Sequence, residues 1–418
     1  MPATAPAAPL SPSVASASAS AGWRLIAWAL VFVGVARLLA YTGTAPYRND
    51  FAHYYLSANI LLSGENPYMT PLEPLCRELG LEYDRRIPTG ANPPLLIRTV
   101  TLVAWLPLPA AYWAWVGLQT LALGGLLMAT RRLIAIDADD ARWLLIVGVV
   151  LNTTTLQRQI YYSQVQVMVA AALAAALLLH VNMRFAAAAA LATLAAALKL
   201  YPAALVPWFM LAGLQGWRDF ARRSLSAAAV GVAVLGVTGI ETWRSFIVDG
   251  LPVIKLSVGT SLTNYSLPNL VNIISGELFG WPLSATAANL TKLCGKLLAV
   301  AALAGAYIVV WRRRLEPIAA LGILTAAMMT ASLVCWSHYF VLMTLPVAWL
   351  WRRASETGAT RGQWPLLIAG SLCLWPELDW AIPITGDLPR LLLHFYPLAA
   401  LAAVGALLAS SRLPCKQA

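Results

Sequence analysis

The sequence has little charge for its length. Only 11% of the 418 residues are Asp, Glu, Lys or Arg, whereas a soluble domain usually carries about a quarter of its residues as these four types. Hydrophobic residues make up 60% of the chain. A water-soluble protein is therefore excluded, and a lipid bilayer is the expected solvent for most of the chain.

Cysteine is also scarce. The five cysteines stand far apart, and only Cys76 lies in a sizeable polar segment, so the sequence offers neither a disulfide framework nor a metal-binding spacing. It lacks a His-Glu-x-x-His motif and a glycine-rich loop that would cradle a nucleotide phosphate. We therefore predict no resident metal and no cofactor.

The basic residues give the chain a net charge of +11. They recur in turns between apolar runs, on alternate connections, which is the pattern of cytoplasmic loops under the positive-inside rule. Both termini are therefore predicted to be cytoplasmic, and the charge requires no nucleic-acid partner. The clusters are Arg131/Arg132/Arg142, Arg184, Arg218/Arg222/Arg223, Arg312/Arg313/Arg314, Arg352/Arg353/Arg361 and Arg412/Lys416.

The apolar runs predict one all-α, polytopic membrane domain over residues 23–411, with about twelve transmembrane helices. Residues 1–22 contain Ala, Ser and Pro without charge and are predicted to be a disordered cytoplasmic N-terminus, and 412–418 form a cytoplasmic tail. Only Arg24 precedes the first apolar run, which favours a retained helix over a signal peptide. The predicted spans are approximately 23–41, 110–130, 143–156, 164–181, 185–198, 201–214, 225–240, 288–310, 317–335, 338–351, 364–377 and 389–411.

Polar segments accumulate on the predicted extracytoplasmic side. The first loop, 42–109, contains an apolar stretch at 95–106 that holds Arg98 and is predicted to lie along the membrane interface. A second large loop covers 241–287, and the short segment 157–164 joins the same side. The helices 185–198 and 201–214 are too short to cross separately, so they are expected to dip into the membrane and turn at Lys199-Leu200-Tyr201-Pro202.

Three polar residues near this side stand out by position. Asp50 follows the first span, where a carboxylate can take a proton from a sugar hydroxyl as a general base, or simply cap a helix. Lys199 lies between apolar helices, where it either meets an anion such as a phosphate or extends to the head groups. His338 begins a helix, where an imidazole is more often only a hydrogen-bonded interface residue.

Five segments in order resemble one known family. Asp50 to Tyr68, D-F-A-H-Y-Y-L-S-A-N-I-L-L-S-G-E-N-P-Y, resembles the first-loop signature of glycosyltransferase family 87, the polyprenyl-phosphate-mannose-dependent mannosyltransferases of the GT-C superfamily. The later segments are similar to the family's G-Q-x-N, K-x-x-P, N-Q-S-L and W-x-H-Y elements. They are Ser163-Gln164-Val165-Gln166, Lys199-Leu200-Tyr201-Pro202, Asn264-Tyr265-Ser266-Leu267 and Trp336-Ser337-His338-Tyr339-Phe340.

The resemblance implies an inverting GT-C-type transferase in the cell inner membrane. Its partners would be a polyprenyl-phosphate sugar donor, membrane lipids and a glycan or glycolipid acceptor, with mannose as the sugar. It implies catalytic roles for Asp50 and His338. The implied donor-phosphate ligands are Lys199 and Gln164, and the implied substrate-binding residues are Asn66, Tyr68, Asn264 and Ser266.

Two other classes of protein stay open at this stage. A secondary transporter or a lipid-linked-sugar flippase also needs many spans, but it places its polar groups near the bilayer midplane, and Lys199 in a broken hairpin is its best support. A non-catalytic scaffold, or an enzyme that ligates whole polymer chains, has the same composition. Secondary candidates on the polar face are Asp84, Arg85, Arg86, Glu377 and Asp379.

Overall fold

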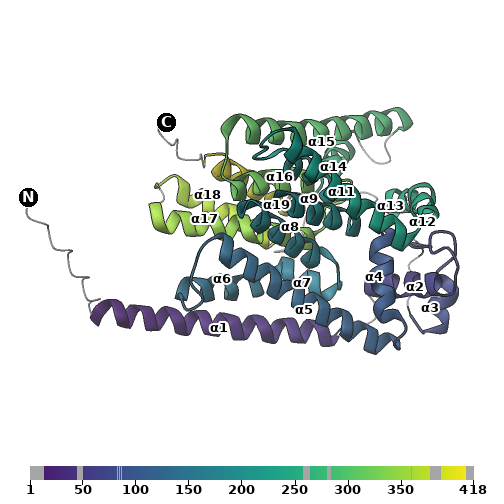
Figure 1. Cartoon of the computed structure of the whole chain (residues 1–418), viewed down its shortest axis with the longest axis horizontal. Helices are drawn as coiled ribbons and strands as arrows, with labels where there is room; N and C mark the ends of the chain where they lie inside the picture. Colours follow the sequence, from purple (N-terminus) through teal and green to yellow (C-terminus); the bar gives the residue numbers. More distant parts are fainter. Residues whose placement is uncertain are drawn as a thin grey trace, which may run out of the picture.

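The computed structural model of the chain describes residues 14–44, 50–81, 83, 85, 87–257, 264–279, 284–358, 360–376 and 387–410. Throughout these residues the regular elements are helices, and none of the described segments forms a strand (Figure 1). The all-α prediction is therefore confirmed for the part of the chain that the structure describes.

Among the described residues, four helices are long and apolar enough to cross a membrane. Large apolar side chains such as Phe32, Leu121, Val232 and Val300 lie exposed on their surfaces, which is the arrangement expected of helices that face lipid. The chain is therefore a multi-pass membrane protein. The four helices are α1 (Val14–Thr44), α5 (Leu108–Leu133), α11 (Trp217–Thr238) and α15 (Ala285–Arg313).

The other predicted spans form shorter apolar helices, which are too short to cross a hydrocarbon core of about 30 Å as single straight helices. Several of them make up the core between the long helices. They include α6 (Ala141–Leu151), α8 (Gln166–Val181), α9 (Phe185–Leu198), α16 (Pro317–Ala331) and α18 (Gln363–Ser371). Two further predicted spans correspond to α17 (Thr344–Thr357) and to the 23-residue helix α19 (Asp387–Ala409).

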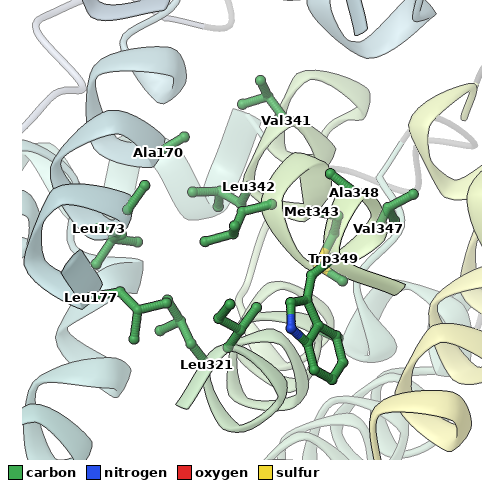
Figure 2. Close-up of a cluster of buried hydrophobic side chains, with 14 of the residues drawn as sticks. Ala170, Leu173, Leu177, Leu321, Val341, Leu342, Met343, Val347, Ala348 and Trp349 are labelled. Carbon is green, nitrogen blue, oxygen red and sulfur yellow. The ribbon is translucent and has the colours of Figure 1, made fainter. Parts of the chain in front are cut away.

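The largest buried cluster joins α8 to the C-terminal third of the chain. Figure 2 shows Leu173 and Leu177 of α8 facing Leu321 of α16, with Leu342 and Trp349 contributed by the following segments. These segments are the 3-10 helix η3 (Ser337–Met343) and α17. Because η3 begins with Ser337 and His338, this packing fixes where the first turn of η3 lies.

The N-terminal helix is longer than predicted. α1 begins at Val14, inside the segment 1–22 that was predicted to be disordered, and residues 1–13 lie outside the described part of the chain. Residues 14–22 are mainly Ala and Ser, and a helix that is already nucleated by an apolar run extends through alanine at little cost in free energy.

The predicted broken hairpin is confirmed. α9 ends at Leu198, Lys199 has an extended backbone, and the 3-10 helix η1 (Tyr201–Leu205) follows with Pro202 in its first turn. α10 (Val206–Leu211) then completes the second arm. Proline suits the start of a helix because the first backbone N–H groups have no partner within the helix.

The two large polar loops are folded into short helices at one end of the molecule. α2, α3, α4, α12 and α13 lie together there, and α4 runs across the direction of α1 (Figure 1). The predicted helix at 95–106 is therefore confirmed as α4. The bounds are α2 (Asp50–Leu62), α3 (Glu73–Glu78), α4 (Pro94–Ala104), α12 (Ile240–Ser245) and α13 (Leu251–Ser257).

Basic connections gather at the opposite end, where α1 begins and α17 meets α18 (Figure 1). Arg142 pairs with Asp140 at 2.6 Å, and Arg24 of α1 acts electrostatically on the same carboxylate. Arg353 pairs with Glu316 at 2.6 Å. The segments of Arg24, Arg142 and Arg353, which were predicted to share the cytoplasmic side, thus lie at one end of the molecule.

Candidate functional site

The site is built around the first helix of the polar end. Asp50 is the first residue of α2 and is only partly buried, so its carboxylate lies at a helix N-terminus, where negative charge is stabilised. The carboxylate interacts electrostatically with Lys199, Tyr54 and Tyr339. Asp50 therefore lies near two segments that are distant from it in sequence, the hairpin turn and the start of η3.

Lys199 lies in the extended turn between α9 and η1. Its Nζ donates a hydrogen bond to Oδ1 of Asn92 at 3.1 Å, in the segment just before α4. Its charge also acts on His338. An ammonium group held between apolar helices by a neutral amide, close to a carboxylate and an imidazole, is suited to receive an anionic ligand.

His338 is 4% exposed and lies in the first turn of η3. Neither of its ring nitrogens has a hydrogen-bond partner among the described residues. Its ring packs against Tyr162 at 5.9 Å and Tyr339 at 5.1 Å, measured between ring centroids. Because an unpaired buried polar group costs about 1–3 kcal/mol, a histidine in this state is typical of a site that a ligand completes.

Asp50, Lys199 and His338 are thus brought together from three distant segments. A pair of tyrosines lies beside them, with the rings of Tyr201 and Tyr339 4.8 Å apart. The Tyr201 hydroxyl is buried and has no hydrogen-bond partner among the described residues. The cluster therefore combines a carboxylate, an ammonium, an imidazole and aromatic faces, which together can hold and transform a phosphorylated sugar.

The Gln164 side chain forms a hydrogen bond within the protein. Its Oε1 accepts a hydrogen bond of 2.6 Å from the hydroxyl of Tyr54, one helical turn after Asp50 in α2. The turn that carries Gln164 is itself held by α5, because Trp115 Nε1 donates to the Ser163 carbonyl at 2.9 Å. Gln164 therefore orients the helix that carries Asp50, and its contact with a donor phosphate stays a prediction.

Asn66 and Tyr68 support Lys199 from the first loop. Asn66 accepts from the Tyr68 amide at 3.0 Å and donates to the Ser245 hydroxyl at 2.8 Å, which ties the two polar loops together. The Tyr68 hydroxyl donates to the backbone carbonyl of Asn92 at 2.7 Å. The segment Asn66-Pro67-Tyr68 thus positions Asn92, whose side chain accepts the hydrogen bond from Lys199.

Gly90 completes this support. Its amide donates to the Pro67 carbonyl at 2.7 Å, and a Cβ at position 90 would lie only 2.7 Å from that carbonyl oxygen. The close approach of the two backbones therefore requires glycine.

Asn264 and Ser266 hold the segment that leads into η3. Asn264 Oδ1 accepts from the Cys335 amide at 2.9 Å and from the Ser266 amide at 3.2 Å, and the Ser266 hydroxyl donates to the Leu333 carbonyl at 3.3 Å. Both residues are fully buried. They position His338, which lies a few residues beyond Cys335, and their contact with substrate stays a prediction.

One site residue was not singled out from the sequence. Arg158 is 8% exposed in α7 (Thr154–Tyr161), and its charge acts on His338. A signal was present, because Arg158 is the only Asp, Glu, Lys or Arg between Arg142 and Arg184. The segment was expected to be a short connection, whereas the structure makes it a buried helix that packs on η3.

The secondary candidates stay predictions. Arg85 lies in the first loop, and the other four, Asp84, Arg86, Glu377 and Asp379, lie outside the described residues. Within the described part of the chain, no group of three or more His, Cys, Asp or Glu side chains is placed to hold a metal ion.

Long lipid-facing helices and a cluster of charged and polar side chains at one end define a membrane protein with a polar candidate site. The family model of glycosyltransferase family 87 matches residues 91–337, more than half of the chain, and the chain therefore belongs to this family. It is a membrane glycosyltransferase. The match includes Gln164, Lys199 and Asn264, and ends one residue before His338. No curated protein matches the chain.

Proposed function

We propose that the protein transfers a single sugar, mannose, from a polyprenyl-phosphate donor to a lipid-linked or cell-envelope glycan on the extracytoplasmic side of the inner membrane. The observation that carries this proposal is the meeting of Asp50, Lys199 and His338 at the polar end of the molecule. The opposite end carries the basic connections, which the positive-inside rule assigns to the cytoplasm.

In this reaction Asp50 is the general base. Its carboxylate takes the proton of the acceptor hydroxyl while the hydroxyl oxygen bonds to the anomeric carbon of the donor. The bond between that carbon and the phosphate oxygen breaks, and its electron pair leaves with the polyprenyl phosphate. Because the acceptor attacks from the face opposite the leaving group, the anomeric configuration inverts.

Lys199 and His338 stabilise the departing phosphate. The ammonium is held by Asn92, and the imidazole has two ring nitrogens without a hydrogen-bond partner among the described residues. Both groups are fixed before the donor binds, so little reorganisation is needed as negative charge develops on the leaving group. Tyr54, hydrogen-bonded to Gln164, holds α2, the helix that carries Asp50, in place.

The test is a transfer assay with the purified protein. Radiolabelled polyprenyl-phosphate mannose and a membrane-glycan extract are incubated with the wild type, with Asp50→Asn and with Asp140→Asn. Asp140 is a matched control, because it also starts a helix but lies beside Arg142 at the other end. Asp50→Asn is expected to lower the rate about 100-fold to 10,000-fold.

Asp140→Asn is expected to leave the rate within about twofold of the wild type, since exposed charge pairs contribute little free energy. Equal transfer by the wild type and Asp50→Asn would remove the general-base role. Replacing the donor with polyprenyl-phosphate glucose or polyprenyl-phosphate arabinofuranose tests the sugar, and a faster reaction with either would replace mannose.

A further inference from the structure

Arg158 reaches His338 through the ring of Tyr162, and its charge acts on the imidazole together with that of Lys199. It belongs to α7, whose side chains from Thr155 to Ile160 are all buried. Its guanidinium carbon lies 5.5 Å from the centre of the Tyr162 ring, and Nη1 donates to the Tyr162 hydroxyl at 3.4 Å. The Tyr162 ring in turn packs on His338 at 5.9 Å. Arg158, Tyr162 and His338 therefore form a continuous contact.

α7 is anchored at both of its faces, so Arg158 has a fixed position. Arg37 of α1 donates to the Gln157 side chain at 3.0 Å, and the Thr155 hydroxyl donates to the Ser337 carbonyl at 3.2 Å. The second bond ties α7 directly to the residue before His338. A guanidinium on such a rigid support loses little conformational entropy when it binds a ligand.

Two cations, Lys199 and Arg158, both act on His338. Like charges that share a buried region repel each other, and an anionic ligand converts this repulsion into attraction. Both ring nitrogens of His338 lack a hydrogen-bond partner among the described residues, and the Tyr162 ring connects His338 to Arg158. Asp50 supplies one negative charge beside Lys199, and Arg158 adds a second positive charge to the same region, which favours an anionic ligand.

We propose that Arg158, together with Lys199 and His338, forms a site that recognises the phosphate monoester dianion of polyprenyl phosphate in preference to the phosphodiester of the sugar donor. The inference rests on the proposed function and assigns Arg158 a role in the same reaction. The planar guanidinium presents two parallel N–H groups, which suit two oxygens of one phosphate.

The chemistry of the step explains the preference. The donor phosphate is a diester with one negative charge. When the bond from the anomeric carbon to the phosphate oxygen breaks, that oxygen keeps the electron pair and the phosphate becomes a monoester with two negative charges. A second cation therefore interacts more strongly with the leaving group than with the donor, and interactions that grow along the reaction raise kcat.

The test measures how well two lipids compete with the donor in the transfer assay. One is polyprenyl phosphate, a dianion, and the other is its methyl ester, a monoanion with the same lipid tail. Arg158→Gln is expected to weaken inhibition by the monoester about 10-fold to 100-fold, as for a lost hydrogen bond to a charged group. Inhibition by the methyl ester is expected to change less than about threefold.

Arg37→Gln is the matched control, because it loosens α7 without removing the charge beside His338. It is expected to change inhibition by both lipids by the same factor. Arg158→Lys keeps the charge but not the planar fork, so it is expected to retain part of the preference. If Arg158→Gln does not fold, as judged by its thermal unfolding, Arg158→Lys supplies the comparison.

Equal weakening of both lipids in the Arg158 variants would overturn the inference, since a purely structural arginine cannot distinguish one charge from two. The proposed function fails separately, if the wild type transfers sugar from none of the polyprenyl-phosphate donors. In that case direct binding of the two lipids to the wild type and to Arg158→Gln still tests the charge preference.

Discussion

The two ends of the molecule use charge in different ways. At the basic end, Arg142 pairs with Asp140 and Arg352 with Glu356, and both pairs join neighbours in sequence that are accessible to solvent. At the polar end, Arg158 and His338 are buried and belong to segments about 180 residues apart that Thr155 and Ser337 hold together. These two pairs at the basic end are thus local and exposed, whereas the contact between Arg158 and His338 is long-range and buried.

We interpret the exposed pairs as structural contacts and the buried cations as parts of the reaction site. The hydrogen bond from Arg142 holds the pKa of the Asp140 carboxyl below its usual value, but such exposed pairs contribute only about 0–1 kcal/mol. A buried cation is costly unless a partner or ligand compensates it. We therefore expect an anionic substrate to bind beside the buried cations Lys199 and Arg158, and the end with the exposed basic pairs to face the cytoplasm.

After Asp50→Asn, the largest effect is expected from Lys199→Met, which removes the ammonium beside Asp50 and His338. The variant should lower kcat/KM about 100-fold to 1,000-fold, the loss typical of a removed electrostatic stabiliser. Lys199→Arg should recover part of the rate. Lys296→Met, on the exposed surface of α15, is the control and should leave kcat/KM unchanged. Equal kcat/KM values for Lys199→Met and Lys296→Met would contradict the role assigned to Lys199.

A smaller effect is expected from Asn264→Ala, and it is measured as the free energy of unfolding. The substitution leaves the buried amides of Cys335 and Ser266 without their acceptor, which should lower the free energy of unfolding by about 1–3 kcal/mol. Asn182→Ala removes a bond to the Leu178 carbonyl at an exposed helix end and should change the unfolding temperature much less. Similar shifts for both variants would contradict the role assigned to Asn264.

Next comes Tyr54→Phe, which removes the hydroxyl that donates to Gln164. The loss should be about 1 kcal/mol in stability, with a matching fall in kcat because α2 holds Asp50 less firmly. A double-mutant cycle with Gln164→Leu measures the interaction directly. The two substitutions should be non-additive. Additive effects would show that the bond does not couple α2 to the α7–α8 turn.

The smallest effect is expected at the basic end. Arg352→Gln removes the i, i+4 pair with Glu356, which should change the free energy of unfolding by less than about 0.5 kcal/mol. Transfer activity should stay at the wild-type level. A loss of activity comparable to that of Lys199→Met would break the distinction between the two ends.

Much of the fold was predictable, because span-length apolar runs and turn residues act locally. The predicted span at 110–130 corresponds to α5 (Leu108–Leu133), and the hairpin arm at 185–198 matches α9. The resemblance to glycosyltransferase family 87 is confirmed by the match over 91–337. The prediction of about twelve spans is confirmed only in part, since many of the predicted spans are helices too short to cross a membrane alone.

The supporting contacts of the site could not be predicted, because they join distant segments. A polar stretch such as Thr154–Tyr161 has the composition of a loop, and its burial depends on a contact with Ser337. Asn264 was predicted to bind substrate from its motif alone, but its hydrogen bonds go to Leu333 and Cys335. Single-sequence patterns carry no information on such pairings.

Sidedness is tested most directly by cysteine labelling in a background without the five natural cysteines. Met69→Cys reports on the first polar loop, where Met69 is 65% exposed, and Ser355→Cys reports on the exposed end of α17. A membrane-impermeant maleimide added outside intact spheroplasts should label position 69 at once and position 355 only after the membrane is opened. Labelling of position 355 alone would place the site in the cytoplasm and contradict the proposed reaction.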